Sequence, residues 1–245
     1  MFWAACVLLF AASTAVTIAG CTAMSGMGTM PMPGEWTMSM TWMPMSGQGW
    51  PALAASFLGM WTAMMAAMML PSLMPVLWRY RGLHSNRLAA LVGMGYFLVW
   101  IVLGVVVFLL GAGFAALAMH QSTVSRVVPV ATGVVVAMAG ALQFTAWKAH
   151  LLACCRDVPA CARDMPTNAG SAWRDGLRRG IHCCLCCAGF TAVLVVNGVM
   201  DLGVMAAVTV AITVERLWPA GMRVARAVGV IVMAAGFGLI VRGVG

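Results

Sequence analysis

Residues 88–119 have the sequence LAALVGMGYFLVWIVLGVVVFLLGAGFAALAM, a run without one charged side chain. An α-helix rises about 1.5 Å per residue, so about 20 apolar residues cross the hydrocarbon core of a bilayer. This run is therefore long enough to span a membrane. The whole chain of 245 residues shares its character, since 63% are hydrophobic and 8% are charged. Such a chain cannot cover a compact fold with polar surface, which excludes a soluble enzyme, a secreted disulfide scaffold and a disordered protein.

Further apolar stretches of spanning length lie on both sides of this run. The stretch 176–218 is longer than one span, and Asn197, Gly198 and Asp201 near its middle form a turn signal that predicts two helices. We therefore expect an all-α fold, a polytopic membrane helical bundle of about seven transmembrane helices, or six if the first is a cleaved signal. The predicted spans are 2–20, 52–78, 88–119, 127–147, 177–197, 200–217 and 222–241.

Polar segments divide the chain into three parts. We expect a first transmembrane helix or signal-like segment at 1–20, a methionine-rich outer loop at 21–51, and a helical membrane domain at 52–245 whose main inner loop is 149–173. The string Ile18-Ala19-Gly20-Cys21 is similar to a bacterial lipobox, whose cysteine is lipidated. A retained helix that ends in small residues is the alternative.

The basic residues predict the orientation of the chain. With the N-terminus inside, twelve of the fourteen lie on the inner side, and Arg126 and Arg242 lie outside. This asymmetry follows the positive-inside rule and indicates a multi-pass protein of the bacterial cytoplasmic (inner) membrane. The net charge of +8 therefore reflects topology. We expect the lipid bilayer as a partner and no nucleic acid.

The outer loop is unusually rich in methionine. Pro31, Pro33 and Pro44 prevent one continuous helix there. A thioether is a soft, uncharged ligand that suits copper(I), so we expect this loop to capture copper(I), whereas adaptable apolar packing is the alternative. The methionines of this outer capture loop are Met24, Met27, Met30, Met32, Met38, Met40, Met43 and Met45.

A second group of methionines lies in the span at 52–78. Met60, Met64 and Met68 are four residues apart and share one helix face, and Met65 and Met69 form an adjacent row. The spacing is similar to the thioether ring of eukaryotic-type copper transporters. It favours a path for a soft metal, with packing as the alternative.

The most specific feature is HCCLCC at residues 182–187. Cys183, Cys186 and Cys187 fall on one helical face, and His182 lies one turn before Cys186. Clustered thiols beside a histidine in a reducing compartment suggest copper(I), with zinc as a second metal, and helix packing is the alternative. Other candidate ligands of this group are Cys184, Cys154 and Cys155, with Met200 and Asp201 as weaker ones. Cys161 lies in the same inner loop, and Glu215 is a weaker candidate still.

These segments together resemble domain-of-unknown-function family 2182, a bacterial family of predicted metal-binding integral membrane proteins. The resemblance covers about 55–220 and implies metal binding without an established reaction. The family pattern has Asn where Asp201 stands and Lys where Arg216 stands. The matching segments are Trp61 with Ala63–Ser72, Leu142–Thr145, Lys148, Cys154–Arg156, Gly176–Gly180, Cys183–Cys187, Gly198–Leu202, Glu215–Arg216 and Pro219.

The expected function is the binding and handling, or transport, of a soft metal, most simply copper(I), across the cytoplasmic membrane. One alternative is a non-catalytic assembly or accessory subunit of a membrane metalloenzyme, whose subunits would then be partners. A membrane thiol oxidoreductase is the third. No arrangement of catalytic residues is visible, so we expect no enzyme. The metal ion is the expected ligand, and association into homo-oligomers stays open.

The charge distribution gives a prediction about orientation. A reporter fused after Gly170 should be cytoplasmic, and one inserted near Gly34 should be external, because twelve of fourteen basic residues then lie inside. Paired alkaline-phosphatase and fluorescent-protein fusions measure both positions. External activity at Gly170 would reverse the sidedness of every candidate ligand.

Overall fold

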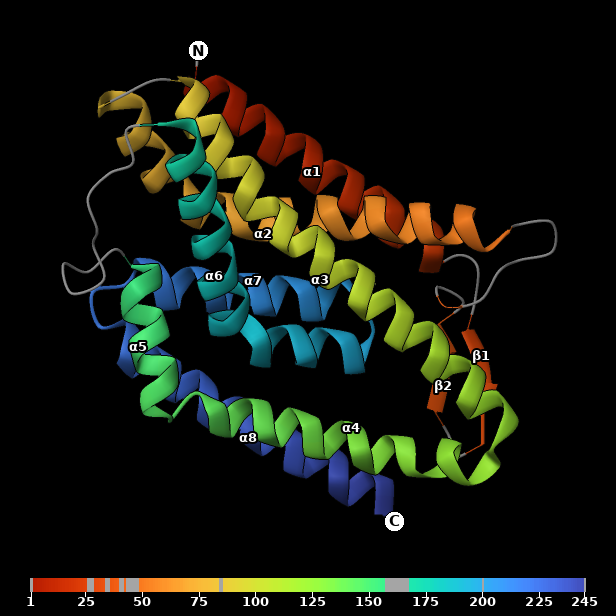
Figure 1. Ribbon diagram of the computed structural model, residues 1–245. Helices are drawn as coiled ribbons and strands as arrows, with labels where there is room; N and C mark the ends of the chain where they lie inside the picture. Colours follow the sequence, from red (N-terminus) through yellow and green to blue (C-terminus); the bar gives the residue numbers. More distant parts are fainter. Residues whose placement is uncertain are drawn as a thin grey trace.

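A computed structural model describes residues 2–25, 29–33, 36–39, 42, 49–83, 86–156, 168–199 and 201–244. Within these ranges the protein is a helical bundle with one small hairpin, as the all-α prediction required (Figure 1). The elements are α1 (Phe2–Ser25), β1 (Thr29–Met32), β2 (Trp36–Ser39), α2 (Trp50–Leu83), α3 (Asn86–His120), α4 (Ser122–Leu142), α5 (Ala146–Cys155), α6 (Ala169–Asn197), α7 (Leu202–Leu217) and α8 (Gly221–Val244).

Among the described residues, six helices are long and apolar enough to cross a membrane: α1, α2, α3, α4, α6 and α8. The predicted turn inside 176–218 is confirmed, because α6 ends at Asn197 and Gly198 adopts a φ of 112° that favours glycine. The following helix α7 has 16 residues. It is shorter than the roughly 20 residues of a full span, so the expected seven spans become six.

The predicted span at 127–147 is wrong in its last five residues, 143–147. Helix α4 ends at Leu142, and a short turn leads into the separate helix α5. Thr145 is the N-cap of α5, since its side-chain oxygen accepts a hydrogen bond from the Lys148 backbone N–H at 3.2 Å. This break redirects the chain, so residues up to Cys155 of the expected inner loop are helical and pack on the bundle.

The main hydrophobic core lies around α2. Trp61 and Trp100 are buried there, and the indole Nε1 of Trp61 donates to the Trp100 carbonyl oxygen at 2.9 Å. Apolar side chains also cover the outside of the bundle, such as Leu110 at 69% exposed and Val241 at 73% exposed. Such an apolar surface is stable in contact with lipid. The exposed apolar side chains therefore indicate a membrane protein.

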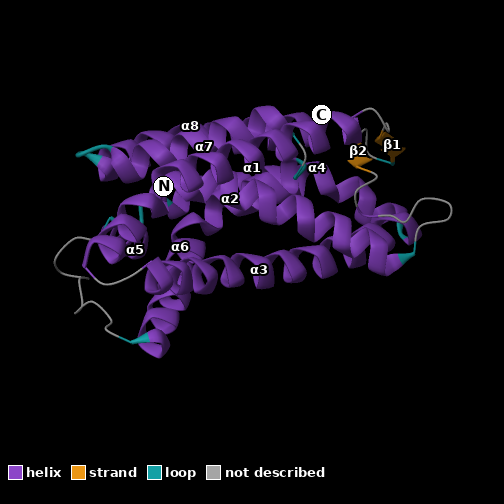
Figure 2. Ribbon diagram, turned by 90° about the horizontal axis from the view of Figure 1, so that it is seen from above, coloured by secondary structure: helices purple, strands orange, loops and turns teal. Residues whose placement is uncertain are grey.

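Close helix contacts depend on small residues. Gly176 of α6 lies against the backbone of Val92 in α3, and Gly140 of α4 lies against the backbone of Gly229 and Met233 in α8. Such contacts let two helices approach closely, which drives association where lipid removes the hydrophobic effect. Helices α4 and α8 run side by side in both views (Figures 1 and 2).

The outer loop contains a β-hairpin. Strands β1 and β2 pair antiparallel, and Met32 and Met38 are buried against Ala115 and Ala118 of α3. Trp36 fixes the hairpin further, because its Nε1 donates to the Ser125 carbonyl oxygen at 2.9 Å. These two thioethers therefore pack, which is the alternative that the sequence left open beside copper(I) capture. Met30 also packs against this cluster.

A substitution at Gly176 tests the α3–α6 contact. Gly176→Ala should lower the free energy of unfolding by about 1–3 kcal/mol, because the added Cβ meets backbone of α3 that cannot rotate away. Unfolding of the purified protein in detergent measures this. Gly59→Ala is the matched control, since a Cβ at Gly59 meets nothing within 4 Å. Equal stability of both variants would contradict the close contact.

Candidate metal centre

Helix α6 presents the cysteine cluster to the interior of the bundle. The helix begins with a capping box, in which Asn168 Oδ1 accepts from the Ser171 backbone N–H at 2.8 Å. Cys183, Cys186 and Cys187 are 2%, 3% and 1% exposed. The shared helical face predicted for these three cysteines therefore points into the protein.

A guanidinium from α7 meets two of these sulfurs. Arg216 Nη2 donates to Cys183 Sγ at 2.9 Å and to Cys187 Sγ at 3.1 Å. Its other terminal nitrogen, Nη1, donates to Ser72 Oγ of α2 at 2.8 Å. Arg216 thus joins three helices at one point.

Cys183 receives a second donor and touches a thioether. Tyr96 Oη of α3 donates to Cys183 Sγ at 2.9 Å, and Cys183 Sγ lies 3.8 Å from Met69 Sδ of α2. The phenol and the guanidinium both favour negative charge on this sulfur, whereas its nearly complete burial opposes that charge. The site therefore brings together two thiols and one thioether, which are soft metal ligands, next to the Arg216 guanidinium.

The methionines of α2 are placed as one buried row. Met64, Met65, Met68 and Met69 are all 4% exposed or less, so both predicted faces point inward. Met60 is partly buried and lies close to Gly20 of α1. Met69, at the end of this row, is the methionine that reaches Cys183.

A second charged group lies beside the cysteines. Lys148 of α5 pairs with Glu215 of α7 at 2.9 Å, and its Nζ also donates to the Cys186 carbonyl oxygen at 2.9 Å. Both side chains are buried. Burial lowers the pKa of Lys148, but Cys186 and Glu215 raise it by more, so the net pKa lies above its usual range. The sequence analysis counted Lys148 only among the basic residues of the inner side, and the structure shows that it is buried.

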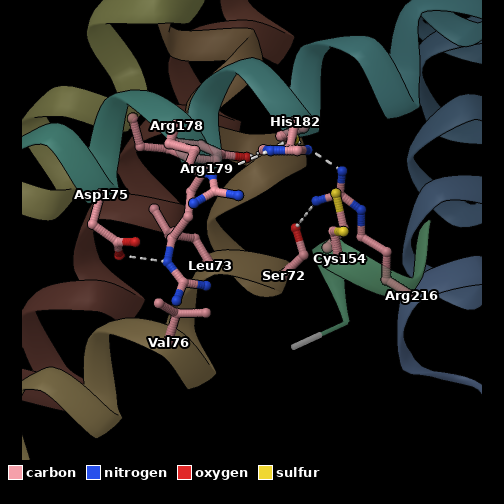
Figure 3. Close-up of a pocket in the computed structure, with 12 residues that line it drawn as sticks. Ser72, Leu73, Val76, Cys154, Asp175, Arg178, Arg179, His182 and Arg216 are labelled. Atoms are coloured by element: carbon pink, nitrogen blue, oxygen red, sulfur yellow. Dashed lines mark hydrogen bonds and ion pairs between the residues drawn. The ribbon is translucent and has the colours of Figure 1, made fainter. Parts of the chain in front are cut away.

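A cleft leads from the surface to the sulfurs (Figure 3). At its rim, Arg179 Nε donates to Asp175 Oδ2 at 2.7 Å, and Tyr80 Oη donates to the same oxygen. Burial and this bond to Asp175 raise the pKa of Tyr80. The lining includes Ser72, Tyr96, Cys154, Cys155, Asp175, Arg178, Arg179, His182, Cys183 and Arg216.

His182 is not positioned as the sequence suggested. Its Nε2 lies 3.5 Å from Arg178 Nε, in place of the expected pairing with Cys186. Its Nδ1 is buried and has no hydrogen-bond partner among the described residues. Cys184, the other neighbour in the cluster, lies about 100° around α6 from Cys183 and packs against the core.

The remaining candidates separate into different roles. Asp201 is exposed and is the N-cap of α7, where its Oδ1 accepts from the Val204 N–H at 2.9 Å. Cys154 is disulfide-bonded, so the expectation of reduced thiols is wrong there, and its Sγ lies 3.7 Å from His150 Nε2. Cys155 is a free thiol. Met27, Met40, Met43, Met45, Cys161 and Met200 lie outside the described residues, and so does the side chain of Met24.

Arg216, Tyr96 and Lys148 are the site residues that the sequence did not identify as such. The sequence analysis counted Arg216 and Lys148 among the basic residues of the inner side. A count of charges near the ends of spans does not show which groups each charged side chain contacts. Among the described residues, no three His, Cys, Asp or Glu side chains form a group that could hold a metal ion. The soft cluster is instead a pair of thiols with a thioether.

These features define a class: a helical membrane protein with a buried pair of thiols, a thioether and a guanidinium. The family model PpoB2, described as copper chaperone, matches residues 58–239. The chain belongs to this family, which concerns copper and is compatible with the resemblance drawn from the sequence. Neither the curated proteins nor the solved structures contain a match.

The Lys148–Glu215 pair gives a test of the site's framework. Lys148→Met should lower the free energy of unfolding by about 3–5 kcal/mol, because it leaves a buried carboxylate without its cation. Removing both charges, with Lys148→Met and Glu215→Met together, should restore most of the loss. Denaturant unfolding in detergent measures both.

The control for this pair is Arg223→Met, because Arg223 is exposed and its loss should change stability by less than about 0.5 kcal/mol. A double variant as unstable as the single one would show that the two charges do not depend on each other.

Proposed function

We propose that this protein is a membrane-embedded copper(I) chaperone that holds the ion between Cys183, Cys187 and Met69. The observation that carries the proposal is the single guanidinium nitrogen of Arg216 shared by both thiols. Two thiolates and one thioether are ligands that copper(I) prefers. The family description, copper chaperone, supports this function.

The charge at the site favours copper(I) over zinc. Two thiolates with a monovalent ion carry one net negative charge, which the Arg216 guanidinium balances. Two thiolates with Zn²⁺ would be neutral and would leave the guanidinium without an anion, which is costly in an apolar interior. Structural zinc also takes four ligands, and the described residues offer no group of three or more His, Cys, Asp or Glu.

The residues around the sulfurs prepare the site for loading. Both thiols lose a proton when they bind the ion. The hydrogen bonds from Tyr96 and Arg216 stabilise the negative charge that develops on Cys183. Met69 supplies a ligand that needs no deprotonation, and its place on α2 completes the set from a second helix.

Transport across the membrane is the second candidate function, and the buried row of Met64, Met65, Met68 and Met69 favours it. The row follows α2 and ends at Cys183, so it supplies soft ligands along the helix. Capture by the outer methionines would be the first step of such a path. Copper flux into vesicles that contain the purified protein distinguishes a transporter from a chaperone that holds its cargo.

Substitution of the two thiols tests the proposed site. Cys183→Ser with Cys187→Ser should abolish copper that survives desalting, because a hydroxyl is a hard ligand. Arg216→Met should weaken copper(I) affinity by about 10- to 100-fold, and Arg216→Lys should keep more of it because the cation remains. Elemental analysis and competition with a copper(I) chelator measure these changes.

The matched control is Cys184→Ser, since the described hydrogen bonds of Arg216 go to Cys183, Cys187 and Ser72 and not to this neighbouring thiol. Copper retention should also fall as pH falls, because protons compete for the thiolates. Full retention by the double serine variant, or equal loss in the Cys184 variant, would disprove the assignment.

A further inference from the structure

The thiol pair at Arg216 continues into a row of four thiols. One guanidinium nitrogen of Arg216 joins Cys183 to Cys187, Cys186 precedes Cys187 on α6, and Cys186 packs in one small cluster with Cys155. The first three lie on α6 and the fourth on α5. The row therefore leads from the centre of the bundle to a different helix.

Cys155 is the accessible end of this row. It packs with Leu151, Leu152 and Ala225 in the same small cluster as Cys186, and it is partly exposed. It also lines the cleft that reaches Cys183. Cys183 and Cys187 are almost completely buried, so Cys155 is more accessible from outside than either of them.

Positive charge accompanies the row along its length. Arg216 interacts electrostatically with Cys155 as well as with Cys183 and Cys187. Lys148 Nζ donates a hydrogen bond to the backbone carbonyl oxygen of Cys186, and Glu215 forms an ion pair with the same lysine. A thiolate at any position in the row therefore has a cation near it, which lowers the cost of burying the charge.

We propose that Cys155 and Cys186 form a second copper(I) station, through which the ion enters and leaves the buried Cys183–Cys187 site. This inference rests on the proposed function, because it needs the buried site to hold copper. The inference adds a position at which copper is exchanged. A protein that donates or accepts copper would then contact α5.

The transfer is a ligand exchange without redox change. Copper(I) starts on the Cys183 and Cys187 thiolates. The Cys186 thiol loses its proton as its sulfur bonds to copper, and the Cys183 sulfur takes up a proton as its bond to copper breaks. Cys155 then replaces Cys187 in the same way. Copper stays monovalent, two thiolates are present throughout, and no proton is gained or lost overall.

The test measures the rate of copper release from the full chain. Anaerobic protein loaded with one equivalent of copper(I) is mixed with excess sulfonated bidentate copper(I) chelator, and the coloured complex is followed in time. Cys155→Ser should slow release by at least about tenfold, because the chelator loses a positioned intermediate ligand. Cys186→Ser should do the same, and equilibrium affinity should change little in either variant.

Cys184→Ser is the control, since Cys184 is a thiol of the same helix that packs against the core, and its release rate should match the wild type. Wild-type rates in both Cys155→Ser and Cys186→Ser would overturn the second station while leaving the proposed function intact. Loss of tight copper from Cys155→Ser would also overturn it, because Cys155 would then belong to the holding site. A wild-type protein that retains no copper would instead refute the proposed function.

Discussion

The bond between the Arg216 guanidinium and the α6 sulfurs organises the centre of this protein. A cation in an apolar bundle costs several kcal/mol unless anions or strong acceptors surround it. Arg216 finds its acceptors on two helices, at Ser72 of α2 and at Cys183 and Cys187 of α6. The positions of α2, α6 and α7 are therefore tied to one side chain, and in the proposed function the same side chain balances the charge of copper(I) bound to two thiolates.

The neighbouring acid extends this arrangement to a fourth helix. Glu215 precedes Arg216 on α7, yet its carboxylate pairs with Lys148 of α5. Two adjacent charges of α7 thus bind different partners, so α7 links the cysteines of α6 to α5. A helix of 16 residues, too short to be counted as a span, carries both interactions. The same helix also packs, since Met205, Val208 and Ile212 are buried in the main core.

The sequence predicted the helices and the cysteine face because both follow from local periodicity. The turn at Gly198 was predictable for the same reason, since turn chemistry is local. The break between α4 and α5 was not, because residues 142–147 remain largely apolar and the cap at Thr145 is a short signal. The partners of Lys148 and Arg216 lie far away in sequence. Counting charges placed both residues at the inner side, but no local pattern showed which groups they meet.

The order in which the chain is synthesised gives the shared guanidinium a further consequence. Met69 emerges from the ribosome first, the cysteines of α6 much later, and Arg216 last of the three. Until Arg216 emerges, Cys183 and Cys187 lack the guanidinium that both of them accept from. A nascent chain therefore lacks a complete cradle for a metal, and the pocket forms at the moment α7 docks. In the proposed function, completion of the fold and competence for copper would therefore be a single event in biogenesis.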